Sequence, residues 1–183
     1  NYLTYEKIFG VNNVKMMAGA SWEQFLANDN NLSVYGFKND FHKYNNVNVS
    51  EDYNHPGSNY YDWTMNSYFF RGNYSYDSKY SLTLTGRYDG SSRFGKDNKY
   101  AFFPSAGISW LVSEEDFISE IEFINWLRLR ASYGITGNSE IGLYNSMATI
   151  ASGTTLIGGE LASASYPARL ANSELQWEKS NQA

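Results

Sequence analysis

The side chains that could do chemistry are concentrated in one polar stretch, residues 26–63. Its two histidines, His42 and His55, have no nucleophile or metal-ligand partner at a recognisable spacing. We interpret both as solvated loop residues rather than catalytic or metal-binding groups. The 183-residue chain contains no cysteine, which excludes a thiolate zinc site and a thiol nucleophile. The sequence therefore predicts a protein that is not an enzyme and holds no catalytic metal.

Two clusters in the same stretch could offer oxygen ligands to calcium. They are Asn28-Asp29-Asn30-Asn31 and Glu51-Asp52. The twelve-residue pattern of a calcium-binding loop is absent, and Asn and Asp are common turn residues. We predict no cofactor, with calcium in the outer loops as the alternative.

Aromatic residues are the best candidates for contacting a ligand or a partner. The chain is 17% aromatic, with 16 Tyr, and Tyr favours half-wet surfaces over a dry core. Exposed rings can stack on sugars or anchor a protein lid. The alternative is that they pack the loop onto its surroundings, and both remain open. The candidates are Tyr53, Tyr60, Tyr61 and Trp63, with Tyr144 and Tyr166 treated in the same way.

Residues 67–88 give the clearest structural element, a hairpin with opposite faces of different polarity. Successive strand side chains point to opposite faces. The apolar face carries Tyr68, Phe70, Gly72, Tyr74, Tyr76, Tyr80, Leu82, Leu84 and Tyr88. In a membrane barrel the opposite, polar face lines the lumen, where guanidinium groups pair with carboxylates or orient polar substrate. The predicted lumen-facing residues are Arg71, Arg87, Arg128, Arg130 and Asp89.

The rings of the apolar face lie at the strand ends, with Leu82 and Leu84 between them. A soluble sandwich fills its apolar face mostly with aliphatic residues, whereas a membrane barrel gathers rings at the two interfaces. We therefore predict a membrane girdle made of Trp22, Tyr68, Tyr74, Tyr76, Tyr80, Tyr88, Trp110 and Trp126.

The same alternation predicts about seven antiparallel strands along residues 1–183. They are expected at 2–9, 14–25, 67–76, 80–89, 100–112, 126–136 and 175–183. Long outer loops are expected at 26–63 and 137–173, and the alternation of short turns with long loops is typical of outer-membrane barrels. Pro104 predicts a local irregularity. Residues 113–125 predict a short amphipathic helix in a turn on the periplasmic side, with Ser113 as its N-cap.

Net charge and hydropathy further restrict the class of protein and its possible partners. The net charge of −5 argues against nucleic acid as a partner. No run of about 18 apolar residues is present, so no transmembrane helix is predicted. The chain starts inside strand-like sequence, and we expect it to be a fragment or a processed piece.

Four segments resemble consecutive strands of SusC/RagA-type TonB-dependent outer-membrane transporters. They read YSLTLTGRYDGSSRFG, YAFFPSAGISWLVSEEDF, LRLRASYGITGNSEIG and ELQWEKSNQA. The resemblance covers residues 67–183 well and residues 2–25 more loosely, and the loop at 26–63 matches no known motif.

The resemblance implies an all-β antiparallel transmembrane barrel segment in the cell outer membrane, cut from a barrel of about 22 strands. Such transporters import oligosaccharides or peptides. They are energised by TonB, plugged by an N-terminal domain that the lumen-facing arginines could contact, and paired with a SusD-like lipoprotein. Neither the plug nor a TonB box is visible here, nor is the strand that closes the barrel. The alternative is a soluble carbohydrate-binding β-sandwich module.

Overall fold

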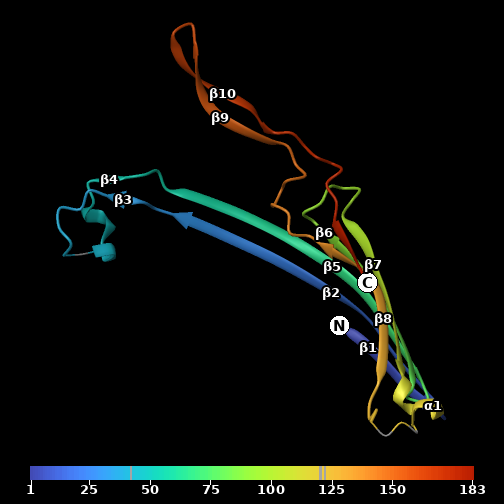
Figure 1. The fold of residues 1–183 in the computed structure, drawn as a ribbon. Helices are drawn as coiled ribbons and strands as arrows, with labels where there is room; N and C mark the ends of the chain where they lie inside the picture. Colours follow the sequence, from blue (N-terminus) through green and yellow to red (C-terminus); the bar gives the residue numbers. More distant parts are fainter. Residues whose placement is uncertain (42, 120, 122) are drawn as a thin grey trace. The chain divides into compact units, whose positions relative to one another are not determined.

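The computed structural model describes residues 1–41, 43–119, 121 and 123–183 (Figure 1). His42 and two positions of the predicted helix, Glu120 and Glu122, lie outside the described residues. The chain divides into two compact units. One joins Asn1–Glu23 with Thr64–Ala183, and the other is Gln24–Trp63.

Seven strands form one antiparallel sheet in which nearly every strand pairs with its neighbours in the chain. The order is β1-β2-β5-β6-β7-β8-β11. Their bounds are Tyr2–Phe9, Asn12–Asn31, Gly57–Tyr76, Tyr80–Ser91, Tyr100–Leu111, Arg128–Asn138 and Glu178–Gln182. The predicted all-β segment of about seven strands is thus confirmed, with β1 and β11 at the two edges of the sheet.

Tight turns fix the register of the two predicted hairpins. Between β5 and β6, Asp77 and Ser78 adopt φ of 50° and 56°, and Lys79 N–H donates to the carbonyl of Tyr76 at 3.1 Å. Two consecutive residues with positive φ match the right-handed twist of the flanking strands. Between β1 and β2, Gly10 supplies the positive φ, 59°.

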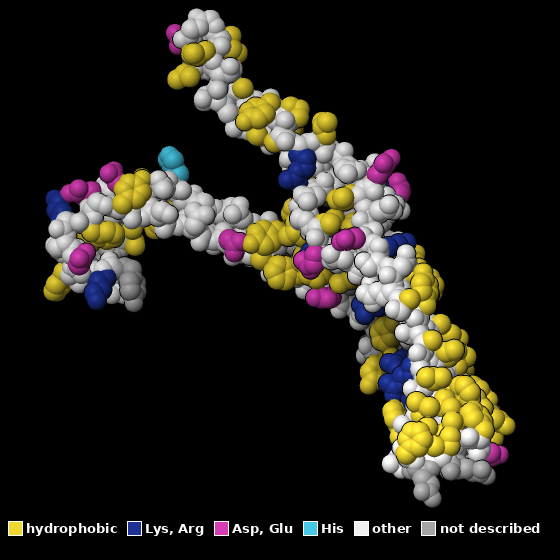
Figure 2. All heavy atoms as spheres, viewed as in Figure 1, with side chains coloured by type: hydrophobic (Ala, Val, Ile, Leu, Met, Phe, Trp, Pro, Cys, Tyr) yellow, Lys and Arg dark blue, Asp and Glu magenta, His cyan; other side chains and the backbone are white. Residues whose placement is uncertain are grey.

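The register places the predicted apolar residues on one face. Leu82 lies between Tyr74 and Ile108, and Leu84 between Gly72 and Ala106. A second protein layer would bury these side chains, yet Leu82, Leu84, Ile108 and Leu129 are 37–61% exposed. Figure 2 shows hydrophobic side chains gathered on the visible surface of this sheet. The exposed aliphatic face is the surface that lipid would cover.

Both connections predicted as long loops contain strands. β2 continues to Asn31 and β5 begins at Gly57. Between them lie β3 (Val34–Tyr35), paired with β4 (Asp52–Tyr53), and two 3-10 turns, η1 (Lys43–Asn45) and η2 (Val47–Val49). The second connection holds a separate hairpin of β9 (Thr149–Ile157) and β10 (Glu160–Arg169). The long connections predicted at 26–63 and 137–173 thus contain strand segments that the sequence analysis did not indicate.

The connection after β7 is helical, as predicted, over a shorter span. It contains η3 (Val112–Glu114) and α1 (Asp116–Ser119). Leu111, rather than Ser113, precedes the first turn. Among the described residues, no helix is long and apolar enough to cross a membrane.

Pro104 interrupts only one of its two ladders. The β6–β7 register runs through it, with Gly86 opposite. The β7–β8 ladder ends at Ser105, the residue that follows the proline, and proline has no N–H to donate.

The buried core is small and lies beside the ends of the strands opposite the tight turns. Its four buried side chains, Phe94, Ala101, Phe103 and Trp177, form what we call the rim cluster. Met65, Ile135, Ile141 and Leu175 pack against it. Ile135 of β8 thus contributes to this internal packing.

Candidate functional site

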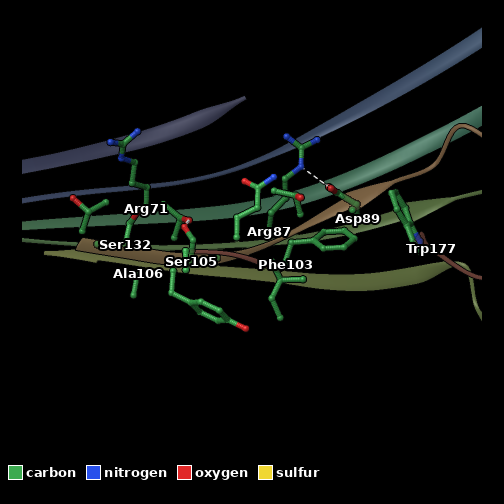
Figure 3. A pocket seen from close by; sticks show the side chains of 18 of the residues that line it. Arg71, Arg87, Asp89, Phe103, Ser105, Ala106, Ser132 and Trp177 are labelled. Carbon is green, nitrogen blue, oxygen red and sulfur yellow. Dashed lines mark hydrogen bonds and ion pairs between the residues drawn. The ribbon is translucent and has the colours of Figure 1, made fainter. Parts of the chain in front are cut away.

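A hollow of about 860 Å³ follows the polar face of strands β5 to β8 and β11 (Figure 3). Arg71, Thr83, Thr85, Arg87, Ser105 and Ser132 are among the residues that line it. Period-2 alternation on each strand delivers these side chains to one side. The surface can offer hydrogen bonds and positive charge to a polar partner.

Arg87 and Asp89 form an ion pair within this surface, as Figure 3 shows. They are two residues apart on β6 and therefore share a face. Arg87 Nε donates to the Asp89 carboxylate at 2.6 and 2.8 Å, and Arg87 Nη2 donates to Ser67 Oγ at 3.1 Å. Asp89 is 6% exposed, so the guanidinium compensates a buried charge. This geometry favours a structural role for the pair.

For the three other predicted lumen arginines, the described part of the chain shows no ion pair. Within the described residues, Arg71 and Arg130 are exposed and have no hydrogen-bond or ion-pair partner. Arg128 lies over the ring of Trp126 at 5.4 Å, and its Nε is buried without a hydrogen-bond partner. The register sets Arg71 opposite Thr85 and Arg130 opposite Ser109, on the polar face. Guanidinium groups placed in this way could pair with carboxylates brought to the polar face.

The four aromatic candidates of the Gln24–Trp63 unit divide into two pairs. Tyr61 O–H donates to the carboxylate of Asp29, and Trp63 stacks on Phe25 with ring centroids 5.8 Å apart. Tyr53 and Tyr60 are 65% and 59% exposed. Packing thus engages Tyr61 and Trp63, whereas the other two rings are open to contact.

The predicted oxygen-rich clusters are partly engaged in other bonds. Besides Asp29, Asn31 Oδ1 accepts from Gly57 N–H at 3.1 Å, and Glu51 pairs with Lys38 at 3.3 Å. In the described part of the chain, no three His, Asp or Glu side chains gather as a metal site would require. His55 is exposed.

Two rows of rings border the aliphatic face. At the turn end, the register aligns Tyr76, Tyr80 and Trp110, and the Tyr80 ring lies 6.3 Å from each of the others. At the other end it aligns Tyr68, Tyr88 and Phe102. Trp22 and Trp126 are exposed as well, and Tyr74 lies on the same face. The eight residue-to-residue steps from Tyr80 to Tyr88 span about 26 Å along the strand at about 3.3 Å per step, comparable with an apolar band of about 25 Å.

Glu115 is a polar contact of the girdle that the sequence analysis missed. Its carboxylate accepts from Tyr80 O–H at 2.6 Å and from Trp110 Nε1 at 3.0 Å. The hydrogen bond from Tyr80, followed by that from Trp110, lowers the pKa of Glu115 below its ordinary value.

The rim cluster was also missed, although its members stand in the quoted motifs. Trp177 packs against Phe94 and Phe103 with ring centroids 5.0 and 5.3 Å away, and its Nε1 donates to the carbonyl of Lys99 at 2.9 Å. Arg93 Nη1 donates to the carbonyl of Ser139 at 3.3 Å. The cluster therefore joins connections that are far apart in the sequence. The signal that could have revealed the cluster was the presence of large aromatic residues, Phe94 and Trp177, in otherwise polar connections.

Comparison with known proteins agrees with this geometry. The family model "TonB dependent receptor-like, beta-barrel" matches residues 1–183. TonB-dependent receptor P3 of Formosa agariphila is 37% identical over 182 residues, which is 100% of this chain and 18% of the relative. TonB-dependent receptor SusC of Bacteroides thetaiotaomicron is 35% identical over 141 residues, which is 77% of this chain and 14% of the relative.

Solved structures give the same result. The structure of the RagAB peptide transporter superposes with a TM-score of 0.84 and 28% identity, over 98% of this chain and 20% of that chain. The chain thus spans about a fifth of the length of the proteins it matches. The expected resemblance to SusC/RagA-type transporters of the outer membrane is confirmed. The chain belongs to the family of TonB-dependent receptor β-barrels.

Proposed function

We propose that this chain is a wall segment of an outer-membrane importer that takes up oligosaccharides or peptides, is energised by TonB and works with a SusD-like lipoprotein. The observation that carries the proposal is the two-sided sheet. One face exposes aliphatic residues between rows of rings. The other face forms a polar hollow lined by Arg71, and the register sets Arg130 on the same polar face. A soluble sugar-binding sandwich would bury Leu82, Leu84 and Ile108, which are exposed. We propose no catalytic role.

The uncompensated arginines suggest what the hollow receives. Removing a charge from water without a partner is costly, so Arg71, Arg128 and Arg130 need carboxylates once the lumen is filled. A plug domain inside the barrel would bring such groups within reach. We infer that the three arginines hold the plug, and that Arg87 with Asp89 keeps the wall itself in shape.

Cargo contact is better supported for the exposed rings of the Gln24–Trp63 unit. Tyr53 and Tyr60 are exposed, and an exposed ring can stack on a sugar or pack against a peptide side chain. RagAB is a peptide transporter and importer, which favours peptide as cargo. Oligosaccharide remains the second cargo class, since the same rings would serve it.

Uptake by whole cells tests the proposal. Cells lacking the full-length receptor are supplied with wild-type or variant receptor and given fluorescently labelled peptide or oligosaccharide mixtures. We expect uptake of one cargo class, lost when TonB is removed. The pair Tyr53→Ala and Tyr60→Ala should reduce uptake, and Val47→Ala, an exposed aliphatic of the same unit, is the control. Uptake that persists without TonB would show a passive pore and contradict the proposal.

A further inference from the structure

The apolar surface of the sheet continues beyond the strand ends, onto the connection that follows β7. Phe117, in α1, is 64% exposed. Its ring centroid lies 6.4 Å from that of Trp110, which stands in the row of rings at the turn end. Figure 2 shows hydrophobic side chains gathered continuously over this end of the sheet. The connection after β7 therefore extends the lipid-facing surface of the sheet.

Glu115 fixes this connection against the outer face of the sheet. Its carboxylate joins two strands, because it accepts from Tyr80 of β6 and from Trp110 of β7. Backbone bonds hold the same segment from both sides. Leu111 N–H donates to the carbonyl of Lys79 at 2.8 Å, and Ser113 N–H donates to that of Leu127 at 3.2 Å. With Glu115 held, Phe117 two residues later is confined to the same side as Trp110.

We propose that Tyr80, Trp110, Glu115 and Phe117 form an interfacial anchor, in which Phe117 enters the boundary between phospholipid headgroups and acyl chains at the turn end of the barrel. Apolar side chains of a short amphipathic segment can lie in this boundary, and Tyr and Trp rings prefer it. Glu115 acts as a positioning residue, because it orders the connection without itself entering the apolar layer.

Lipid is the partner that the surroundings favour. The anchor is continuous with the exposed aliphatic face of Leu82, Ile108 and Leu129, and that face meets hydrocarbon in an outer-membrane barrel. A docking protein would have to cover Phe117 while leaving adjacent girdle rings to lipid. The inference rests on the membrane location of the barrel and not on its cargo, so its test is independent of the import assay.

Nitroxide labels measure the environment directly. In the full-length receptor, freed of other cysteines and placed in phosphatidylethanolamine–phosphatidylglycerol vesicles, labels are introduced at Phe117→Cys, Ile108→Cys and Asn125→Cys. Ile108 reports the lipid face, and Asn125 is an exposed polar residue of the same connection. We expect the ratio of oxygen to nickel-chelate collision rates at 117 to exceed that at 125 several-fold and to stay below that at 108. A ratio at 117 equal to that at 125 overturns the proposal, as does protection from both agents, which would mean a protein contact.

A second pair of variants tests the role of Glu115. Glu115→Ala in the 117-labelled receptor should increase label mobility and lower the oxygen-to-nickel ratio, because the bonds to Tyr80 and Trp110 are lost. Glu115→Gln keeps an acceptor oxygen and should preserve both readouts. An unchanged spectrum in the alanine variant would overturn the positioning role. Heat-dependent mobility in gels confirms that each variant has an assembled barrel.

Discussion

Leu84 offers the most direct test of which face meets lipid. It lies four residues from Tyr80 and four from Tyr88, so it is midway between the two rows of rings. Its cross-strand neighbours, Gly72 and Ala106, are small, and the side chain is 46% exposed. Replacement by arginine would therefore put a charge at the bilayer midplane with little protein to shelter it. The expected cost is about 2–4 kcal/mol, which is roughly a 30- to 1,000-fold loss in the folded-to-unfolded ratio.

Thr83→Arg is the matched control, since Thr83 is the preceding residue and lines the hollow on the opposite face. This change removes the hydrogen bond from Thr83 Oγ1 to Asn73, worth about 0.5–1.5 kcal/mol, and leaves the new charge in water. Urea titration of full-length receptor folding into phospholipid vesicles measures both variants. Equal destabilisation by the two changes, or tolerance of Leu84→Arg, would refute the assignment of faces.

Three further results are expected from the full-length receptor. Phe94→Ala, in the rim cluster, removes a side chain that is 2% exposed, which should cost about 3–5 kcal/mol and speed protease cleavage of the adjoining connections while the strands stay protected. Gly137→Val would drive its side chain into the ring of Phe103. The change should lower the free energy of unfolding by about 1–3 kcal/mol, which a urea titration measures as a lower midpoint. Unchanged stability would show that the ring can move aside. The bond from Tyr80 lowers the pKa of Glu115, so its stabilising contribution is complete above about pH 4.5 and is lost as the pH falls through the depressed value. Acid titration of the urea midpoint should show this loss, and Glu115→Gln should remove this contribution to the pH dependence. Label mobility at 117 should stay unchanged, because a protonated carboxyl keeps an acceptor oxygen for Tyr80 and Trp110, as glutamine does.

Strand positions were predictable wherever the two faces of the sheet meet different surroundings. The expected strand at 2–9 coincides with β1, and those at 80–89 and 100–112 differ from β6 and β7 by two residues or fewer at their ends. Hydrocarbon on one side and polar lumen on the other force a period of two on the sequence. The same pattern placed Arg87 and Asp89 on one face, and the structure pairs them.

The strand predictions failed where the two faces of a strand no longer meet different surroundings. Residues 26–31 continue β2 although their sequence, LANDNN, does not alternate. Strands held by backbone hydrogen bonds with water on both faces need no apolar side, so they leave no period-2 signal. β9 and β10 are similar, because small Ala, Gly, Ser and Thr residues dominate both strands. Turn-type composition therefore hid these strand segments.

The rim cluster escaped prediction for a different reason, which also explains why the family could be recognised. Trp177 and Lys99, joined by a hydrogen bond, are 78 residues apart, and no local period reports a contact of that range. Phe94 and Trp177 nevertheless lie within the DGSSRFG and ELQWEKSNQA segments that carried the resemblance. Alternation is shared by any membrane strand, whereas a buried aromatic cluster with an adjoining Arg87–Asp89 pair demands particular residues at particular positions. The alternation of the strands thus predicts the fold, and the segments that resemble the family also contain Phe94 and Trp177 of the rim cluster.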